Sequence, residues 1–221
     1  MGFIFPHKVK VLKKEYIKQD IIRIFIEKPF GYTYKIGQTI DLSINKPEFA
    51  LEVASFTLMS NENQSYLEII VKVYPDCKEI SNGLSLIAID DCLLISKAWD
   101  YFKYNGPGVF IVDGMYITQI LFVFKQLYVN EVSIKNHNLI LLNETREDIV
   151  FGKELRRLLG NNYIDVITTS EAVKKINTDL LIENLNKDFY VLGSFNFKND
   201  INILLNNLGV KRKKIQCLYE A

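Results

Sequence analysis

The segment whose residues point most clearly to chemistry is a short turn between an apolar strand and a long apolar helix. The strand pattern at 109–112 ends at Asp113 and Gly114, and a long apolar segment follows. A strand–turn–helix unit of this kind brings backbone N–H groups and a helix N-terminus to the diphosphate of a dinucleotide. This turn has one glycine, with the bulky Met115 and Tyr116 directly after it. The unit predicts a dinucleotide site whose phosphate pocket is narrowed by side chains.

Composition places the chain among folded globular proteins. Its 221 residues are 48% hydrophobic and 12% aromatic, which suits one large domain or two small ones with proper cores. Charge is nearly balanced, with 27 basic against 26 acidic residues. The basic run 211–214 is expected to be a solvated loop, because a nucleic-acid site needs a wider basic face with aromatic side chains. We expect no nucleic-acid partner.

The cysteines and the apolar segments narrow the class further. Cys77, Cys92 and Cys217 lie far apart without a C-x-x-C pair, so neither a metal site nor an iron–sulfur cluster is expected. An odd number of thiols suits a reducing compartment. The apolar start is too short for a signal peptide, and no stretch approaches the roughly 18–20 apolar residues of a membrane span. We expect a cytoplasmic protein without a membrane segment, and its oligomeric state stays open.

The first hundred residues show the period-two pattern of half-buried strands. Ile22, Ile24 and Ile26 share one face, and the longest alternating run spans 66–74. Turn residues separate these runs at short intervals. Six or so short antiparallel strands at this spacing predict a small β-barrel, which we prefer to a sandwich.

The second half alternates short apolar runs with helix-like segments. The runs that could be buried strands are 108–112, 138–142, 163–167 and 189–192. Helices are predicted near 117–128, 147–159, 178–186 and 199–208. This alternation predicts a doubly wound parallel sheet, whose ligands bind at the carboxyl ends of the strands. We predict two domains, a barrel over 1–103 and an α/β domain over 104–221.

Three segments at the joints of this plan carry a family resemblance: 54–60 (ASFTLMS), 113–119 (DGMYITQ) and 143–149 (NETREDI). Their residues and order resemble the ferredoxin/flavodoxin–NAD(P)H reductase family, most closely its compact bacterial flavodoxin-reductase-like members. In that family the barrel holds FAD and the following sheet holds NAD(P)H. The resemblance implies a flavoprotein oxidoreductase that passes electrons through FAD between a nicotinamide nucleotide and a carrier protein such as flavodoxin or ferredoxin.

The resemblance implies flavin contacts in the first of these segments. Phe56 is expected to pack on the flavin, and Thr57 to bind near its N5 atom, which makes Thr57 the candidate catalytic residue. Ser60 completes the motif. The arginine that pairs with cofactor phosphate in the family is replaced by Ala54.

A second group of FAD contacts is implied between 74 and 84. Tyr74 is a candidate wall of the cofactor site, and backbone amides near Ile80 and Ser81 are expected to receive the diphosphate. The family's glycine in this segment is Glu79 here. Further on, Trp99 is interpreted as an interdomain packing residue rather than a cofactor contact.

The expected NAD(P)H contacts lie at the ends of the predicted parallel strands. They are Gly114, Thr118, Asn143 and Gly193, and Thr118 is also expected to reach the flavin edge. Asp113 is interpreted as a helix-capping residue.

Two interpretations of the second domain stay open. The loop 143–149 is read as a capping segment, with Asp148 in the first turn of the next helix. Because side chains replace glycines in the turn at 113–116, an alternative function remains. It is a non-catalytic or flavin-only protein that has lost ordinary NAD(P)H binding and serves as a binding module. The choice between NADH and NADPH and the electron acceptor also stay open.

Overall fold

A computed structural model describes residues 5–49, 51–73, 80–100, 102–129, 134–167, 176 and 178–217. The chain divides into two compact units, residues 1–101 and 102–221. This division lies close to the boundary that the sequence places at 103/104.

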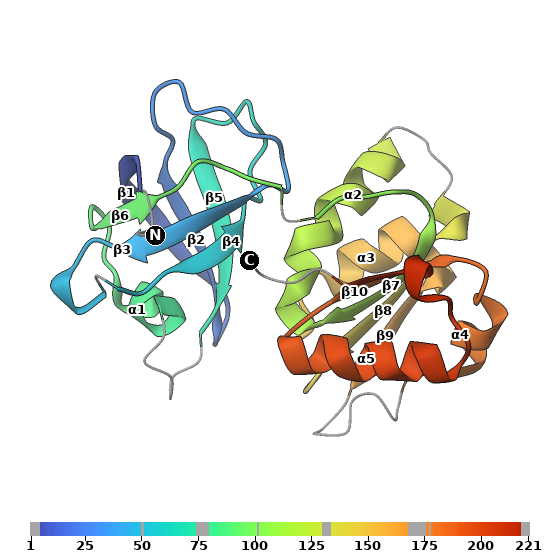
Figure 1. The fold of residues 1–221 in the computed structure, drawn as a ribbon. Coiled ribbons are helices and arrows are strands. Elements are labelled where there is room, and N and C mark those ends of the chain that lie inside the picture. The colour runs from blue at the N-terminus through green and yellow to red at the C-terminus, as the bar shows by residue number, and fades with distance from the viewer. Residues whose placement is uncertain are drawn as a thin grey trace. The chain divides into compact units, whose positions relative to one another are not determined.

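The first unit is built from an antiparallel sheet of six strands in the order β4-β3-β6-β1-β2-β5 (Figure 1). The strands are β1 (His7–Lys18), β2 (Ile21–Glu27), β3 (Thr39–Ile44), β4 (Ala54–Thr57), β5 (Tyr66–Lys72) and β6 (Cys92–Ile95). The two edge strands meet just past β4, where the backbone N–H of Met59 donates to the Glu68 carbonyl at 2.8 Å. The sheet therefore closes into the predicted barrel.

The core of the barrel follows the predicted alternation. Ile24 and Ile26 are fully buried, and they lie opposite Ile69 and Leu67 of β5. A 3-10 turn (Pro47–Phe49) and a short helix, α1 (Ile80–Leu86), complete the unit. The sequence pattern did not predict α1, because seven residues are too few to establish a helical period.

The second unit is a five-stranded parallel sheet in the order β11-β10-β7-β8-β9. Its strands are β7 (Gly108–Asp113), β8 (Asn138–Asn143), β9 (Tyr163–Ile167), β10 (Asp188–Leu192) and β11 (Ile215–Cys217). Its helices are α2 (Thr118–Val129), α3 (Gly152–Leu159), α4 (Thr178–Glu183) and α5 (Phe195–Asn207), with 3-10 turns at Gly114–Ile117, Ile134–Asn136, Gly160–Asn162 and Arg212–Lys214. The chain runs outward from β7 to β9 and then returns to β10 on the other side of β7. The direction of strand order therefore changes between β7 and β10.

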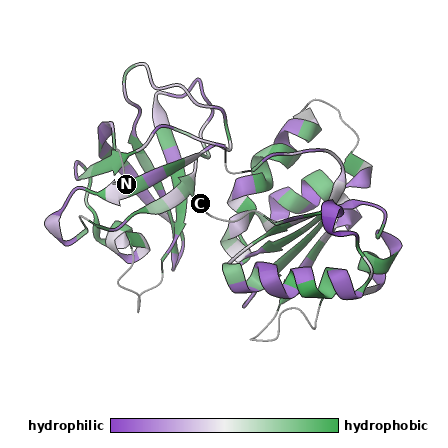
Figure 2. Ribbon diagram, in the orientation of Figure 1, coloured by the Kyte–Doolittle hydropathy of each residue, from purple (hydrophilic) through white to green (hydrophobic). Residues whose placement is uncertain are grey.

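Both faces of this sheet are covered, which confirms the doubly wound arrangement (Figure 1). On one face Leu181 of α4 and Ile201 of α5 belong to the same buried cluster as Ile111. On the other face the ring of Phe124 from α2 meets Phe110 edge-on, with centroids 5.1 Å apart. Figure 2 shows the strands of this sheet as largely hydrophobic, as expected for strands buried on both sides.

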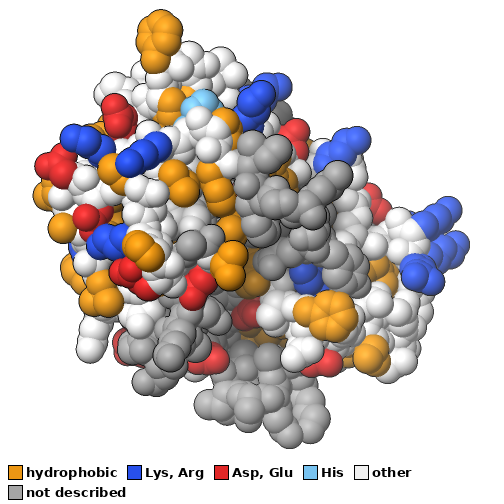
Figure 3. Space-filling model, turned by 60° about the vertical axis from the view of Figure 1, so that its left-hand side comes forward, with side chains coloured by type: hydrophobic (Ala, Val, Ile, Leu, Met, Phe, Trp, Pro, Cys, Tyr) orange, Lys and Arg blue, Asp and Glu red, His pale blue; other side chains and the backbone are white. Residues whose placement is uncertain are grey.

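The surface carries both signs of charge, and basic and acidic side chains are interspersed on the face drawn in Figure 3. The basic run 211–214 lies between α5 and β11 and is largely exposed, as expected for a solvated loop. Within the described part of the chain, no three or more His, Cys, Asp or Glu side chains are grouped to hold a metal ion. None of the described helices is long and apolar enough to cross a membrane.

Candidate functional site

The predicted flavin residues lie on β4. Phe56 lies opposite Ile40 of β3 and packs, partly buried, against the barrel core. Thr57 is the next residue, so its side chain lies on the other face of the strand. It lies opposite Thr39, and the two threonines are only 6% and 1% exposed. Phe56 and Thr57 thus do not share a face of β4.

Thr39 was not singled out by the sequence. Its backbone N–H and C=O both bond to Trp99, at 2.8 and 2.9 Å, so Trp99 flanks it on the side away from β4. The Oγ1 atom of Thr39 is buried and has no hydrogen-bond partner among the described residues. A lone threonine in an alternating strand gives no signal, and only the long-range register places this hydroxyl beside Thr57.

Ser60, the last residue of the first motif, holds the barrel closed. Its Oγ lies 2.7 Å from the hydroxyl of Tyr34 and accepts from the Glu68 N–H at 3.2 Å. Burial raises the pKa of the Tyr34 hydroxyl, so this hydroxyl stays protonated and can donate. The Ser60 hydroxyl therefore already has structural partners.

The second group of predicted FAD residues lies at the start of α1. Ile80 is buried in the barrel core, whereas the Ser81 hydroxyl is buried without a hydrogen-bond partner among the described residues. Tyr74 and Glu79 lie outside the described residues. A buried hydroxyl without a partner costs free energy, and a hydrogen bond to a bound group would remove that cost. Ser81 is therefore available to form such a hydrogen bond.

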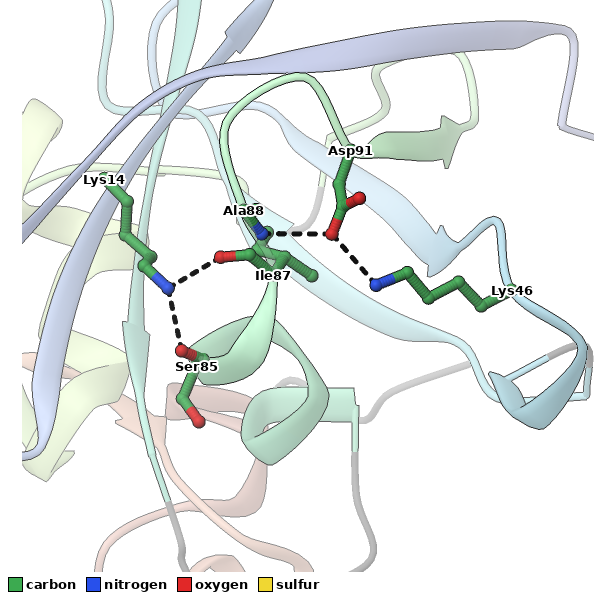
Figure 4. A network of polar contacts seen from close by, with 6 residues as sticks. All are labelled: Lys14, Lys46, Ser85, Ile87, Ala88 and Asp91. Atoms are coloured by element: carbon green, nitrogen blue, oxygen red, sulfur yellow. Dashed lines mark hydrogen bonds and ion pairs between the residues drawn. The ribbon is translucent and has the colours of Figure 1, made fainter.

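Two lysines fix the far end of α1 and the loop after it (Figure 4). Lys14 Nζ donates to the carbonyls of Ser85 and Ile87, at 2.8 and 2.7 Å. Lys46 Nζ lies 2.9 Å from Asp91 Oδ2, which also accepts from the Ala88 N–H at 3.0 Å. The Ala88 hydrogen bond, followed by Lys46, lowers the pKa of Asp91. Lys14 thereby pairs with carbonyl groups at the C-terminus of α1, where a helix leaves them without partners of its own.

In the second unit the structure brings Gly114, Asn143 and Gly193 to one edge of the sheet. Gly114 follows β7 with φ +45°, and a Cβ there would lie 3.8 Å from Asn143 Oδ1. A Cβ at Gly193 would lie 2.8 Å from the Cβ of Asp113 and 2.3 Å from the ring of Phe197. The carboxyl ends of β8, β7 and β10 therefore adjoin, and β7 and β10 flank the reversal of strand order where such sheets bind ligands.

Asn143 is the most informative residue at this edge. It is 5% exposed, and neither its Oδ1 nor its Nδ2 has a hydrogen-bond partner among the described residues. Buried amides are nearly always bonded, because leaving one unpaired costs about 1–3 kcal/mol. The Thr118 hydroxyl, in contrast, donates to the Met115 carbonyl at 3.0 Å within the turn.

Two capping predictions in the second unit were wrong. The side chain of Asp113 makes no capping hydrogen bond to the 3-10 turn that follows it. Asp148 does not lie in a helix, because it accepts from the N–H and the hydroxyl of Thr145 at 2.9 and 2.8 Å, and this local turn delays the helix to Gly152. Ser194 is the capping residue at this edge, since its Oγ accepts from the Phe197 N–H at 3.3 Å.

Comparison with known proteins agrees with this arrangement. Residues 7–91 match a family described as an FAD-binding domain. NADH-cytochrome b5 reductase 2 of Danio rerio is 26% identical over 188 residues, which cover 71% of this chain and 60% of the relative. The first unit thus matches an FAD-binding domain over most of its length, and the chain is similar in sequence to a reductase.

Solved structures support the same fold. A ferredoxin NADP+ reductase from Neisseria gonorrhoeae with bound FAD and NADP superimposes with a TM-score of 0.72 at 17% identity, over 96% of this chain and 97% of the reductase. Phthalate dioxygenase reductase superimposes with a TM-score of 0.74 at 15% identity, over 96% of this chain and 67% of the reductase. A type IV self-sufficient cytochrome P450 monooxygenase superimposes with a TM-score of 0.73 at 14% identity. The match covers 97% of this chain and 28% of that larger protein. These identities establish the fold alone.

Proposed function

We propose that this chain binds FAD in its barrel unit and NAD(P)H at the carboxyl edge of its parallel sheet, and passes electrons to a carrier protein such as flavodoxin or ferredoxin. The related proteins support this role. The Danio rerio relative is named an NADH-cytochrome b5 reductase. Phthalate dioxygenase reductase is described as a modular structure for electron transfer from pyridine nucleotides to a [2Fe-2S] centre.

The observation that carries the nucleotide half of this proposal is the buried amide of Asn143, which has no hydrogen-bond partner among the described residues. It lies beside a glycine in the left-handed conformation, at the carboxyl end of β8, which pairs with β7, one of the two strands that flank the reversal of strand order. A ligand that reaches past Gly114, which has no side chain, supplies the missing partners. The first unit offers comparable groups for FAD in the buried hydroxyls of Ser81 and Thr39, which have no hydrogen-bond partner within the described part of the chain.

In this proposal the residues of the chain hold and orient FAD, and FAD supplies the redox chemistry. Thr57 offers a hydroxyl near the reactive edge of the flavin, and Ser81 offers a hydroxyl to a phosphate oxygen. Phe56, on the opposite face of β4, packs against the barrel core. FAD, when bound, accepts a hydride from nicotinamide and releases electrons singly or in pairs. Ala54 supplies no cation to the diphosphate at the position where the family has an arginine.

A second candidate function, a flavin-only or non-catalytic protein, is favoured by Asp113. Its Cβ lies close to Gly193, so this carboxylate stands at the edge where a nucleotide diphosphate would bind. Like charges repel, and a carboxylate competes with an anion for the positive end of the following helix. The two candidate functions therefore differ in whether NAD(P)H binds at this edge in the presence of the Asp113 carboxylate.

The experiment that tests the proposal follows the visible absorbance of flavin. The purified protein is titrated with FAD and then mixed anaerobically with NADH or NADPH in a stopped-flow instrument. We expect FAD to bind and its absorbance to bleach. Protein that takes up no FAD contradicts the proposal, and bound FAD that neither nucleotide bleaches selects the second candidate.

Two substitutions on β4 sharpen this experiment. Thr57→Val keeps the shape of the side chain but removes the hydroxyl, so bleaching should slow by about tenfold or more. Ser55→Ala is the matched control, because the exposed Ser55 hydroxyl bonds to Asp41 Oδ1 at 2.7 Å on the same strand. Its bleaching rate should remain that of the unsubstituted protein.

A further inference from the structure

The outer edge of β1 is covered by β6 over only part of its length. In the sheet β1 lies between β6 and β2, and it pairs with β6 over His7–Lys10. Val11 then exchanges backbone hydrogen bonds with Asp90 and Asp91, each at 2.9 Å. Beyond Val11 none of the described strands pairs with this edge, whereas β2 stays paired with the opposite edge as far as Lys18. Within the described part of the chain, the second half of β1 therefore has a strand on one side only.

Exposed apolar side chains gather along this open edge. Lys14 Nζ donates to the two carbonyls on either side of Leu86, which places Leu86 beside β1 (Figure 4). Ile89 precedes the two residues that bond to Val11, so it lies beside Leu12. The exposed apolar residues on or beside the edge, named here the β1-edge patch, are Leu12, Tyr16, Ile17, Leu86 and Ile89. A contiguous patch of this kind marks an interaction surface rather than scattered exposed residues.

The lysines near the middle of this edge are engaged within the chain. Lysines on an edge strand ordinarily prevent pairing with another chain. Here the Lys13 ammonium forms an ion pair with Glu15. Lys14 is turned to the end of α1, where it bonds to two carbonyls at 2.8 and 2.7 Å. Neither charge is therefore left to repel a second strand.

The residues along this edge complement themselves under a two-fold rotation. Two copies of β1, placed edge to edge in opposite directions with the axis at Lys14, set Lys13 of each copy opposite Glu15 of the other. The same register sets Leu12 opposite Tyr16, again twice. A register centred on Glu15 would instead place two carboxylates opposite each other. The two Lys14 side chains at the axis are turned to their own α1 helices.

We infer that the outer edge of β1 is a homodimer interface, in which β1 pairs with β1 of a second copy and the two β1-edge patches cover each other. A second copy is favoured over an unrelated partner because it supplies the opposite charges and the apolar side chains in one register. The pairing of β1 with β2 shifts register between Val11 and Lys13 and between Tyr16 and Lys18. The regular stretch between these shifts is short, so side chains supply most of the contact.

The oligomeric state tests this inference directly. Analytical ultracentrifugation of the full chain is performed over about 1–100 µM, the range in which a dimer of moderate affinity dissociates. We expect a species of twice the chain mass of 25.6 kDa that dissociates on dilution. Ile89→Lys should raise the Kd of this dimer by about tenfold or more. Ile203→Lys on α5 is the matched control, because Ile203 is 59% exposed against 61% for Ile89, and it should leave the Kd unchanged.

A charge exchange tests the register. Lys13→Glu sets carboxylates opposite each other at two places in the dimer, so it should also weaken the dimer by about tenfold or more. Adding Glu15→Lys to Lys13→Glu restores opposite charges and should restore the Kd.

Three results would overturn the inference. A double variant as weak as Lys13→Glu rules out the pairing of β1 with β1. A dimer that neither Ile89→Lys nor Lys13→Glu weakens uses another surface. A chain that stays monomeric at about 100 µM has no such interface, and if it binds phosphatidylserine vesicles the patch belongs to a membrane surface instead.

Discussion

At the scale of single residues, the hydrogen bonds of the polar side chains separate structural from functional positions. Ser60 belongs to the first predicted motif and is buried, yet its hydroxyl has partners that hold the barrel together. Asn143 and Ser81 are buried to a similar degree and have none among the described residues. Folding alone does not favour buried polar groups without partners, and the proposed function assigns them a ligand.

Asn143→Leu tests this interpretation of the second unit. Leucine has a similar size and needs no hydrogen bond, so the ligand-free protein should gain about 1 kcal/mol in its free energy of unfolding. Nucleotide affinity should fall at the same time by about tenfold. Urea denaturation and calorimetric titration measure the two effects on the same protein.

The opposite end of β8 supplies the control. Asn138 Oδ1 accepts from Lys187 Nζ at 3.1 Å, so Asn138→Leu should lower stability and leave nucleotide affinity unchanged. If both substitutions destabilise the protein and neither changes nucleotide affinity, Asn143 has a structural role.

His137 predicts how the stability of the second unit depends on pH. It is fully buried, and its ring nitrogens lie 2.6 Å from the Tyr104 hydroxyl and 3.3 Å from the Ile134 carbonyl. The neutral ring satisfies both contacts, because Nδ1–H donates to the carbonyl and Nε2 accepts from Tyr104. Burial lowers the pKa of His137, and the nearby charge of Lys187 acts in the same direction.

The sign of the pH effect follows from this lowered pKa. The unfolded chain takes up the proton first, so stability is complete above about pH 6.5 and decreases as the pH falls from there toward the folded pKa. His137→Gln should remove that part of the decrease. Urea denaturation at about pH 7 and about pH 5 measures it. If the free energy of unfolding falls equally between these two pH values in the unsubstituted and the His137→Gln protein, the protonation of His137 does not change on unfolding.

At the scale of elements, the sequence predicted best where a pattern is local and repeated. Ile22, Ile24 and Ile26 alternate in the sequence, and they fill one face of β2. Helix starts were predicted less well, because side-chain hydrogen bonds set them. Asp148 forms a turn with Thr145 where a helix was predicted, and Ser194 starts α5 before the predicted position.

The candidate site could be predicted only in part. Gly114 and Gly193 each follow a parallel strand and Asn143 is the last residue of one, and such strand ends always meet at one edge of a sheet. Thr39 meets Thr57 and Trp99 through pairings between strands that are distant in the sequence. No single-sequence pattern specifies that register.

Substitution of Lys14 tests whether FAD binding depends on the hydrogen bonds that anchor the end of α1. Lys14→Met keeps the aliphatic stem but removes two charge-assisted hydrogen bonds to the end of α1, so the free energy of unfolding should fall by about 1–2 kcal/mol. Because α1 carries Ile80 and Ser81, FAD affinity should also fall, by several-fold. Lys8→Met, an exposed position on the same strand, is the control and should change neither quantity. An Lys14→Met protein with unchanged FAD affinity would separate the anchoring of α1 from cofactor binding.

At the scale of the whole molecule, the two units have separate hydrophobic cores, and each proposed ligand belongs to one of them. A ligand that binds only the folded form of a unit stabilises that unit by mass action. Proteins of more than one unit commonly unfold in more than one step. Calorimetric scanning therefore distinguishes the two ligands by the transition that each one moves.

FAD at a hundredfold excess over its Kd should stabilise the first unit by about 2.7 kcal/mol and raise the temperature of one transition. NADH should move the other transition, and the Asn143→Leu protein should lose that second response while keeping the first. A single transition that FAD and NADH both raise would show that the units unfold together, so that neither ligand acts on one core alone. If FAD moves no transition, the barrel does not bind FAD, and a bound cofactor does not explain why the hydroxyls of Ser81 and Thr39 lack partners among the described residues.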